Sequence, residues 1–258
     1  MKPALIIFDW AGTLIDHGCC APLVAFTEAF AACGLPIDDA TARKRMGASK
    51  RDHVREILGE PAIATRVRGE LGIEPDEALG DRLYAAFQER LLEVLPRYAA
   101  PIPGAVEALQ ELRAAGWALG STTGYTRAMM QRLLPSAAKA GLELDALICS
   151  DEVPQGRPAP WACFRLAERF GIYPLSRAVK VGDTPADMAE GQNAGLRCVG
   201  LSASGNELGL SAEQLARLSP IALRELLARA EERLRGAGAE VVLPSVAELP
   251  EWIRGAAG

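Results

Sequence analysis

Long apolar runs and clusters of basic residues are missing from this sequence of 258 residues. No apolar run approaches the roughly 20 residues that a membrane-spanning helix needs, and no signal-peptide pattern precedes the first apolar segment. Lys and Arg are interspersed with Asp and Glu, and the net charge is -5. We therefore expect no membrane partner and no nucleic-acid partner.

Paired cysteines and clustered histidines are also missing. The six cysteines form no C-x-x-C pair and no disulfide-like ladder, which predicts a protein of the reducing cytoplasm. With only two histidines, His17 and His53, the chain offers little for a zinc cluster. A hard cation held by carboxylates remains compatible with the composition.

The chain does contain short apolar runs that alternate with helical patterns. The first run, residues 5–8, ends at Asp9 and is typical of a buried strand in a parallel sheet. After residue 104 the pattern predicts strands at 117–120, 146–149, 178–181, 197–201 and 240–243, and helices at 106–115, 126–140, 160–170, 185–194 and 221–234. This alternation predicts an α/β fold, a doubly wound, Rossmann-like parallel sheet with helices on both faces.

Residues 16–98 interrupt that alternation. They predict helices at 21–33, 38–58 and 74–95 with no sheet strand between them, and the segment is far too long for an ordinary strand-to-helix connection. The prolines and glycine at 96–104 provide a stiff return and a plausible hinge. We therefore interpret 16–98 as an inserted helical cap, and 1–15 with 99–258 as the core.

Four predicted strand ends have polar residues, and ligands of open α/β sheets collect at the carboxyl ends of the strands. Asp9 follows the first strand, and the Ser/Thr/Gly segment 120–124 follows the second, where hydroxyls and backbone N–H groups suit a phosphate. Arg157 adds a cation, and Asp183 with Asp187 adds two carboxylates. Each feature alone has a structural explanation as a turn, a solvated charge or a helix start. Together, and in this order, they predict one site.

These residues resemble, in order along the chain, the four motifs of the haloacid dehalogenase superfamily. The matching residues are Asp9 with Gly12-Thr13, then Thr123, then Arg157, and last Asp183 with Asp187. Many members of that superfamily have a helical cap inserted after the first motif. The resemblance implies that Asp9 is a nucleophile and forms an aspartyl phosphate. It also implies phosphate binding by Thr123, Gly124 and Arg157.

The resemblance further implies a Mg²⁺ cofactor. Asp9, Asp183 and the backbone carbonyl of Ala11 would hold the ion, with Asp187 and Thr13 supporting these ligands from behind. Mg²⁺ and Arg157 together would neutralise charge around the phosphorus, which phosphoryl transfer requires.

Ala11 departs from the superfamily pattern. Phosphatases of the superfamily usually have a second aspartate two positions after the nucleophile, which protonates the leaving oxygen and later activates water. Alanine can do neither. Either the enzyme is inactive, or its leaving group needs no acid at this position.

The predicted cap contains Ser49-Lys50-Arg51-Asp52, a capping-box pattern that makes Lys50 the first residue of a helix. The positive end of the helix dipole and the like charge of Arg51 would both favour the neutral amine. His53 lies three residues on, on the same face, where it could shuttle protons. The alternative, a surface lysine on a helix, holds for most lysines.

The combination of Ala11 with Lys50 closely resembles the phosphonoacetaldehyde hydrolase (phosphonatase) family. The same resemblance is carried by Met46-Gly47, Asp52-His53-Val54, Ser-Thr-Thr-Gly-Tyr-Thr and Gly-Arg-Pro-x-Pro-Trp. The resemblance implies a small phosphonate substrate, a Schiff base at Lys50, a homodimer formed through the cap, and assistance from His53, Cys19, Met46 and Tyr125. An iminium would accept the electrons of the broken C–P bond, so no acid would be needed at Ala11.

Two other functions stay open at this point. One is a phosphatase of the same superfamily that acts on a small phosphorylated metabolite, which Ala11 disfavours. The other is a catalytically silent member that binds a ligand or partner through its cap, which the complete set of four motifs disfavours.

Overall fold

The structure is a computed structural model that describes residues 5–255. Its centre is a six-stranded sheet in the order β3-β2-β1-β4-β5-β6, and every strand pair is parallel. The strands are β1 (Leu5–Phe8), β2 (Ala118–Thr122), β3 (Ala146–Ile148), β4 (Ala178–Gly182), β5 (Arg197–Leu201) and β6 (Val241–Leu243). The predicted doubly wound α/β fold is confirmed.

β1 is the central strand, and its side chains alternate between the two faces of the sheet. Ile6 and Phe8 pack in the same apolar cluster as Leu109 of α6 (Ala105–Ala114). Leu5 and Ile7 pack in a second cluster with Leu166 of α8 (Trp161–Phe170). All four β1 residues are fully buried, which explains why this strand is a continuous apolar run.

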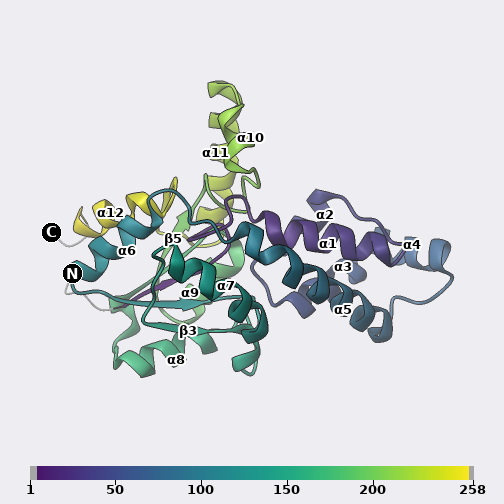
Figure 1. Ribbon diagram of the computed structural model, residues 1–258, viewed down its shortest axis with the longest axis horizontal. Coiled ribbons are helices and arrows are strands. Elements are labelled where there is room, and N and C mark those ends of the chain that lie inside the picture. Colours follow the sequence, from purple (N-terminus) through teal and green to yellow (C-terminus); the bar gives the residue numbers. More distant parts are fainter. Residues whose placement is uncertain (1–4, 256–258) are drawn as a thin grey trace.

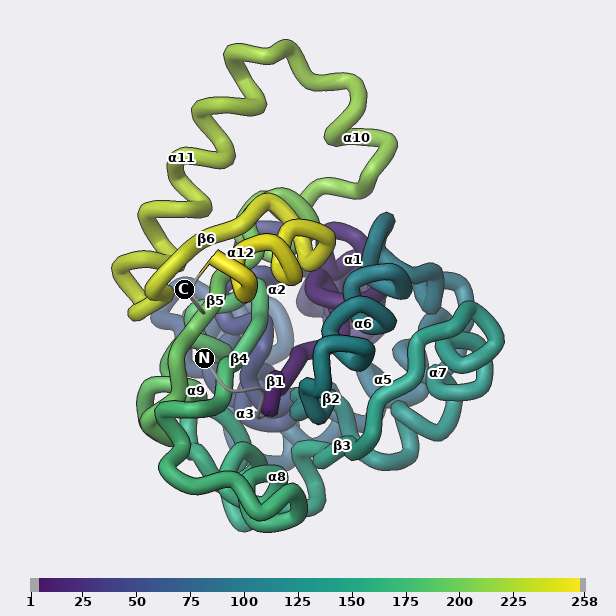
Figure 2. The backbone as a smooth tube through the Cα atoms, turned by 90° about the vertical axis from the view of Figure 1, so that its left-hand side faces the viewer, coloured from purple at the N-terminus to yellow at the C-terminus, as the bar shows by residue number. Residues whose placement is uncertain are grey.

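The remaining core helices complete the two covering layers. Figure 2 shows α6 and α12 on one side of the sheet, and α8 and α9 on the other. Besides α6 and α8, the core contains α7 (Arg127–Lys139), α9 (Pro185–Asn193), α10 (Ala212–Ala216), α11 (Pro220–Gly236) and α12 (Leu249–Gly255), with short 3₁₀ turns at Ser150–Glu152, Leu175–Arg177 and Val246–Glu248. α10 and α11 form an arm that stands away from the body (Figure 1).

Between β1 and β2, where the chain is described without a gap, there is no sheet strand. The segment contains α1 (Cys20–Ala32), α2 (Asp39–Arg43), α3 (Lys50–Gly59), α4 (Pro61–Arg66), a π-helical turn (Val67–Leu71), α5 (Glu77–Val94) and a 3₁₀ turn (Leu95–Tyr98). α5 packs against both α1 and α3, and Figure 1 shows these helices together beyond one edge of the core. This arrangement suits the predicted cap; the boundaries 16–98 stay an interpretation.

The predicted single helix at 38–58 is wrong. The chain forms α2, leaves the helix over residues 44–49, and starts again as α3. Gly47 lies in the left-handed region with φ 91°, which interrupts a right-handed helix. The hydroxyl of Ser49 accepts the Asp52 N–H and so caps α3. The capping pattern at Ser49 was therefore a better guide than the apolar periodicity. α4, α10 and α12 were not predicted.

No helix among residues 5–255 is both long enough and apolar enough to cross a membrane.

Candidate active site

Asp9 lies at the carboxyl end of the central strand, where its backbone N–H continues the sheet by donating to the Val181 carbonyl at 2.9 Å. The residue is 6% exposed. The turn that follows depends on Gly12, which has φ 81°; a Cβ there would lie 2.2 Å from the Asp183 carboxylate. The glycine thus permits the first and the last motif to touch.

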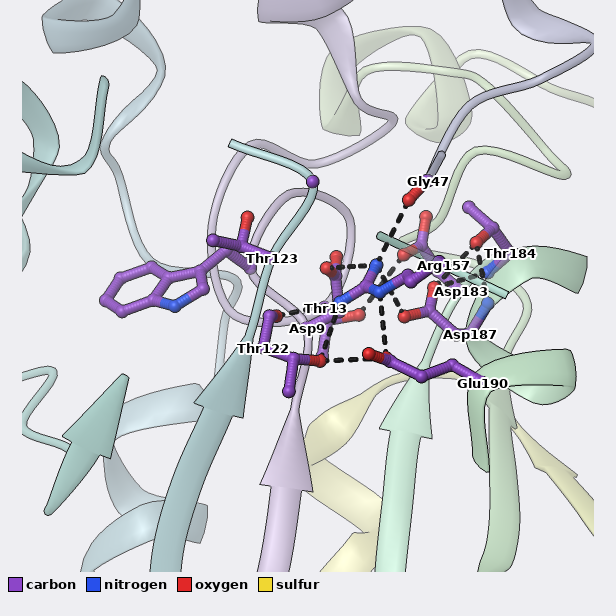
Figure 3. A network of polar contacts seen from close by, with 12 residues as sticks. Asp9, Thr13, Gly47, Thr122, Thr123, Arg157, Asp183, Thr184, Asp187 and Glu190 are labelled. Carbon is purple, nitrogen blue, oxygen red and sulfur yellow. Dashed lines mark hydrogen bonds and ion pairs between the residues drawn. The ribbon is translucent and has the colours of Figure 1, made fainter. Parts of the chain in front are cut away.

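Arg157 fixes the position of the Asp9 carboxylate from one side (Figure 3). Its Nη1 lies 2.8 Å from Asp9 Oδ1 and 2.8 Å from Asp187 Oδ1. Its Nη2 donates to the Thr122 carbonyl at 2.8 Å, and its Nε donates to Glu190 at 2.9 Å. Because every nitrogen of the guanidinium has a partner, its orientation is set before any ligand binds.

Asp9 also faces two further carboxylates, those of Asp183 and Asp187. Oxygens of Asp9, Asp183 and Asp187 lie within 4.8 Å of one another, and all three residues are buried. Burial, together with the charges of Asp9 and Asp187, raises the pKa of Asp183 well above its ordinary value. Thr13 Oγ1 donates to Asp183 Oδ1 at 3.2 Å. Buried carboxylate oxygens with uncompensated charge are donors that suit a hard divalent cation.

The three carboxylates are not equivalent. Burial raises the pKa of Asp9 to about 6, although the charge of Arg157 opposes this. Burial would also raise the pKa of Asp187, but Arg157 and Lys180 hold it below its ordinary value. Asp187 Oδ2 is further occupied by the Thr184 hydroxyl, at 2.6 Å. Asp9 and Asp183 are therefore more available to a cation than Asp187 is.

Lys50 begins α3, as predicted, and its side chain is directed inward rather than to solvent, with only 4% of the residue exposed. Its Nζ lies 3.8 Å from Met46 Sδ and 5.6 Å from the centre of the Tyr125 ring. Burial lowers the pKa of Lys50 to about 8. The predicted direction is right, but its largest cause is burial, which was not predicted, and Arg51 points away and pairs with Asp81 at 3.0 Å.

One small cavity unites nearly all the predicted substrate-facing residues. The sequence-predicted residues among those lining it are Asp9, Ala11, Cys19, Met46, Lys50, Thr123, Gly124, Tyr125 and Arg157. Asp183, Asp187 and Thr13 lie behind this wall and contact it through the interactions above. The amine of Lys50 and the carboxylate of Asp9 thus border the same space.

Two lining residues have unusual environments. Cys19 adopts a left-handed conformation with φ 51° and its Sγ lies 3.2 Å from Asp183 Oδ2. Burial and the nearby carboxylates raise the pKa of this thiol well above its ordinary value, so it is protonated and donates. The Tyr125 hydroxyl is buried and has no hydrogen-bond partner among residues 5–255. A buried hydroxyl without a partner suits a ligand or water.

His53 is not brought into the cavity. It is fully buried behind Lys50 on α3, with its ring 4.2 Å from that of Phe26. In the described part of the chain, neither ring nitrogen makes a hydrogen bond of normal geometry. Burial and the charge of Lys50 lower the pKa of His53 well below its ordinary value, so the ring is neutral. Its predicted role as a proton shuttle stays a prediction.

Comparison with known proteins identifies the family. A family model described as haloacid dehalogenase-like hydrolase matches residues 3–195. The chain is 43% identical to phosphonoacetaldehyde hydrolase of Bacillus cereus over 249 residues, covering 96% of this chain and 94% of the relative. It is 42% identical to phosphonoacetaldehyde hydrolase of Nitratidesulfovibrio vulgaris, covering 94% and 87%. The chain belongs to the phosphonoacetaldehyde hydrolase family.

A solved structure supports the same assignment. The phosphonoacetaldehyde hydrolase-like protein from Oleispira antarctica superposes with a TM-score of 0.96 at 35% identity, covering 99% of this chain and 92% of that chain. The likeness spans both the parallel sheet and the inserted helices. The chain is thus a hydrolase of the haloacid dehalogenase-like class, with an acidic cluster that could hold a divalent metal.

The sequence reasoning missed several buried residues that support this family's site. Thr122, Lys180 and Glu190 surround Arg157 from behind. Lys180 stands in the otherwise apolar strand Ala-Val-Lys-Val-Gly, and a charge in a fully buried strand is itself a signal. Glu190 lies three residues after Asp187 on α9, hence on the same helix face.

Proposed function

We propose that the protein hydrolyses the C–P bond of phosphonoacetaldehyde and releases acetaldehyde and phosphate. One observation carries the proposal: a buried lysine with a lowered pKa, Lys50, shares a small cavity with the strand-end nucleophile Asp9 and with Ala11. The names of the close relatives support the same activity.

In the first step the neutral amine of Lys50 attacks the aldehyde carbon, and loss of water gives an iminium. Burial makes this possible, because it raises the neutral fraction of the amine near neutral pH. Met46 and Tyr125, which contact the lysine head group, would hold the aldehyde end of the substrate. His53 lies on the same helix, and its lowered pKa keeps the ring neutral beside the amine.

In the second step an oxygen of Asp9 attacks the phosphorus. The electrons of the C–P bond move into the iminium, which becomes an enamine, and Asp9 becomes an aspartyl phosphate. Nη1 of Arg157, 2.8 Å from Asp9 Oδ1, offsets the repulsion between the carboxylate and the negatively charged phosphonate. Thr123 and Gly124, which line the cavity, would bind phosphonate oxygens. No acid at Ala11 is needed, because carbon leaves as an enamine.

Two hydrolyses complete the reaction. Water attacks the aspartyl phosphate and frees Asp9 and phosphate. The enamine gains a proton at carbon, and water then cleaves the iminium to acetaldehyde and Lys50. Cys19, a protonated thiol at the cavity wall, would shape the site and contact the leaving carbon fragment.

The donor set fits Mg²⁺. We propose that Asp9, Asp183 and the backbone carbonyl of Ala11 hold the ion, and that Asp187 and Thr13 orient these ligands. Bound there, Mg²⁺ would offset the charge of the phosphonate as Asp9 approaches it. The raised pKa of Asp183 supports this, because it reflects the burial of the carboxyl group together with the nearby negative charges of Asp9 and Asp187.

Removal of the metal should abolish turnover, and added Mg²⁺ should restore it. We also expect Mg²⁺ to raise the Tm of the metal-free protein, since an ion that binds only the folded state stabilises it. The measurement is phosphate release after exhaustive chelation and again after titration with Mg²⁺, beside a thermal melt. Full activity in excess chelator, with no metal detected in the protein, contradicts this prediction.

Schiff-base formation should depend on pH through Lys50. Because burial lowers the pKa of the amine to about 8, the reactive neutral form is lost as the pH falls through that value. The rate of borohydride trapping should therefore rise from pH 6 to 9 with a midpoint about 8. His53 should not contribute to this limb, because its pKa lies well below. A midpoint above 10 would show that Lys50 is not buried in the reacting protein.

The function itself is tested by incubating the protein with phosphonoacetaldehyde and borohydride and locating the modified lysine. Modification at Lys50 together with acetaldehyde and phosphate release supports the proposal. The second candidate, a phosphatase for a small phosphate ester, predicts phosphate release from such an ester and no trapping. A silent member would show neither activity nor aspartyl phosphate.

We also propose a homodimer through the cap and a cytoplasmic location. The first rests on the resemblance to the phosphonatase family, and sedimentation of the intact protein tests it. The second is supported by the six cysteines, all of which are free thiols.

A further inference from the structure

Behind Arg157, on the side away from the cavity, lies a closed group of three buried residues from three elements. Thr122 ends β2, Lys180 is in β4 and Glu190 is in α9. None is more than 1% exposed, and none lines the cavity. Figure 3 shows Thr122 and Glu190 beneath the guanidinium.

Glu190 Oε2 is the centre of this group. It lies 2.9 Å from Arg157 Nε, 2.8 Å from Lys180 Nζ and 2.9 Å from the Thr122 hydroxyl, which donates to it. The Thr122 Oγ1 in turn accepts from Lys180 Nζ at 2.7 Å and from Arg157 Nη2 at 2.9 Å. Lys180 Nζ also lies 3.1 Å from Asp187 Oδ1. Every charged group here is paired, as burial requires.

The geometry divides the guanidinium into two halves. Glu190 and Thr122 hold Nε and Nη2, and this leaves Nη1 directed at Asp9 and Asp187. Without a negative charge behind Nε, the guanidinium would be drawn wholly toward the carboxylates in front. Without Lys180, Glu190 would have an uncompensated share of its charge and would hold Arg157 back more strongly. The charges of Glu190 and Lys180 therefore balance one another and together set the pull on Arg157 from behind.

We propose that Glu190 and Lys180 are a positioning pair, which sets the place of Arg157 Nη1 for attack by Asp9 on phosphorus. The inference rests on the proposed function. The pair acts on the phosphoryl-transfer half of the reaction alone. It makes no contact with Lys50, and it reaches Asp9 through Arg157 and Asp187. Neither residue touches substrate, so neither is a catalytic residue.

A merely structural role predicts something different. Buried ion pairs that only stabilise the fold would, when broken, lower the Tm and reduce both halves of the reaction together. A positioning pair should leave the amine chemistry at Lys50 intact. Misplacement of a positioning group by about 1 Å can cost about 100-fold in rate.

The test is Glu190→Gln, which keeps the shape of the side chain and removes its charge. We expect kcat for phosphate release to fall by about 10- to 100-fold, while the rate of borohydride trapping at Lys50 and the KM stay within about twofold of wild type. Lys180→Met should show the same division. Because the two act as a unit, the double variant should be no worse than the poorer single one. Glu168→Gln, on an exposed helix position, is the matched control and should change neither rate.

Several results would overturn the inference. One is phosphate release near the wild-type rate in folded Glu190→Gln. Another is an equal loss of trapping and of phosphate release. If Glu190→Gln does not fold, the test uses the double variant Lys180→Met with Glu190→Met, which removes both charges together. Retained trapping at Lys50 with lost phosphate release then supports the positioning role of the pair. Phosphate release at the wild-type rate refutes it. Failure of trapping in wild type itself would instead contradict the proposed function, and the pair would then be tested by phosphate release from an ester.

Discussion

Lys50→Arg should abolish turnover of phosphonoacetaldehyde, by roughly 10⁴-fold or more, as losses of covalent catalysts do. Arginine keeps the positive charge and much of the length, but a guanidinium is protonated at all ordinary pH and cannot form an imine. Simple electrostatic binding of the phosphonate would tolerate arginine with a small loss. The measurement is acetaldehyde and phosphate release beside borohydride trapping, in wild type and variant.

The control is Lys44→Arg. Lys44 lies in the loop just before α3, but its side chain is largely exposed and pairs with Glu60, so this exchange should leave turnover unchanged. Near-normal turnover by Lys50→Arg, or trapping that persists at another lysine, would show that the amine has been assigned to the wrong residue.

Asp9→Asn should remove phosphate release by a similar factor, because the amide is too weak a nucleophile to accept the phosphoryl group. The fold should persist. Burial and the neighbouring Asp187 raise the pKa of Asp9, so its charge is disfavoured in the metal-free protein, and a neutral isostere should leave the Tm unchanged or higher. Trapping at Lys50 should continue, since imine formation does not use Asp9. This variant therefore separates the two halves of the reaction.

Asp39→Asn is the matched control for that exchange, since Asp39 is an exposed residue on α2. Substantial phosphate release by folded Asp9→Asn, with deamidation back to aspartate excluded by mass, would be incompatible with a nucleophilic Asp9.

The sequence predicted most of the sheet because buried parallel strands are short apolar runs bounded by turns, and residues 197–201 matched β5 at both ends. The strand-end residues Asp9 and Asp183 converge because parallel strands place their carboxyl ends together, whereas Arg157 reaches them from the loop before α8. The loop at 44–49 was missed because an apolar periodicity continues across Gly47.

Roles that depend on tertiary contacts could not be predicted from the sequence. The burial of Lys50 depends on Met46 and Tyr125, and Tyr125 comes from a different part of the chain. Glu190 and Lys180 meet only once α9 has packed on β4. Periodicity gives the face of an element but not its neighbour, so the pairing of these charges appears only in the folded molecule.

The position of β1 in the sheet has a consequence for folding during synthesis on the ribosome. Leu5 pairs with Ala118 of β2 and with Ala178 of β4, so the first strand to be synthesised waits for both of its neighbours. At about 5–20 residues per second, that wait is on the order of ten seconds or more. Meanwhile α1 and α5, which pack on each other, have both been made. The nascent chain therefore holds an unpaired apolar strand after α1 and α5 have been synthesised, and unpaired apolar strands are prone to aggregation.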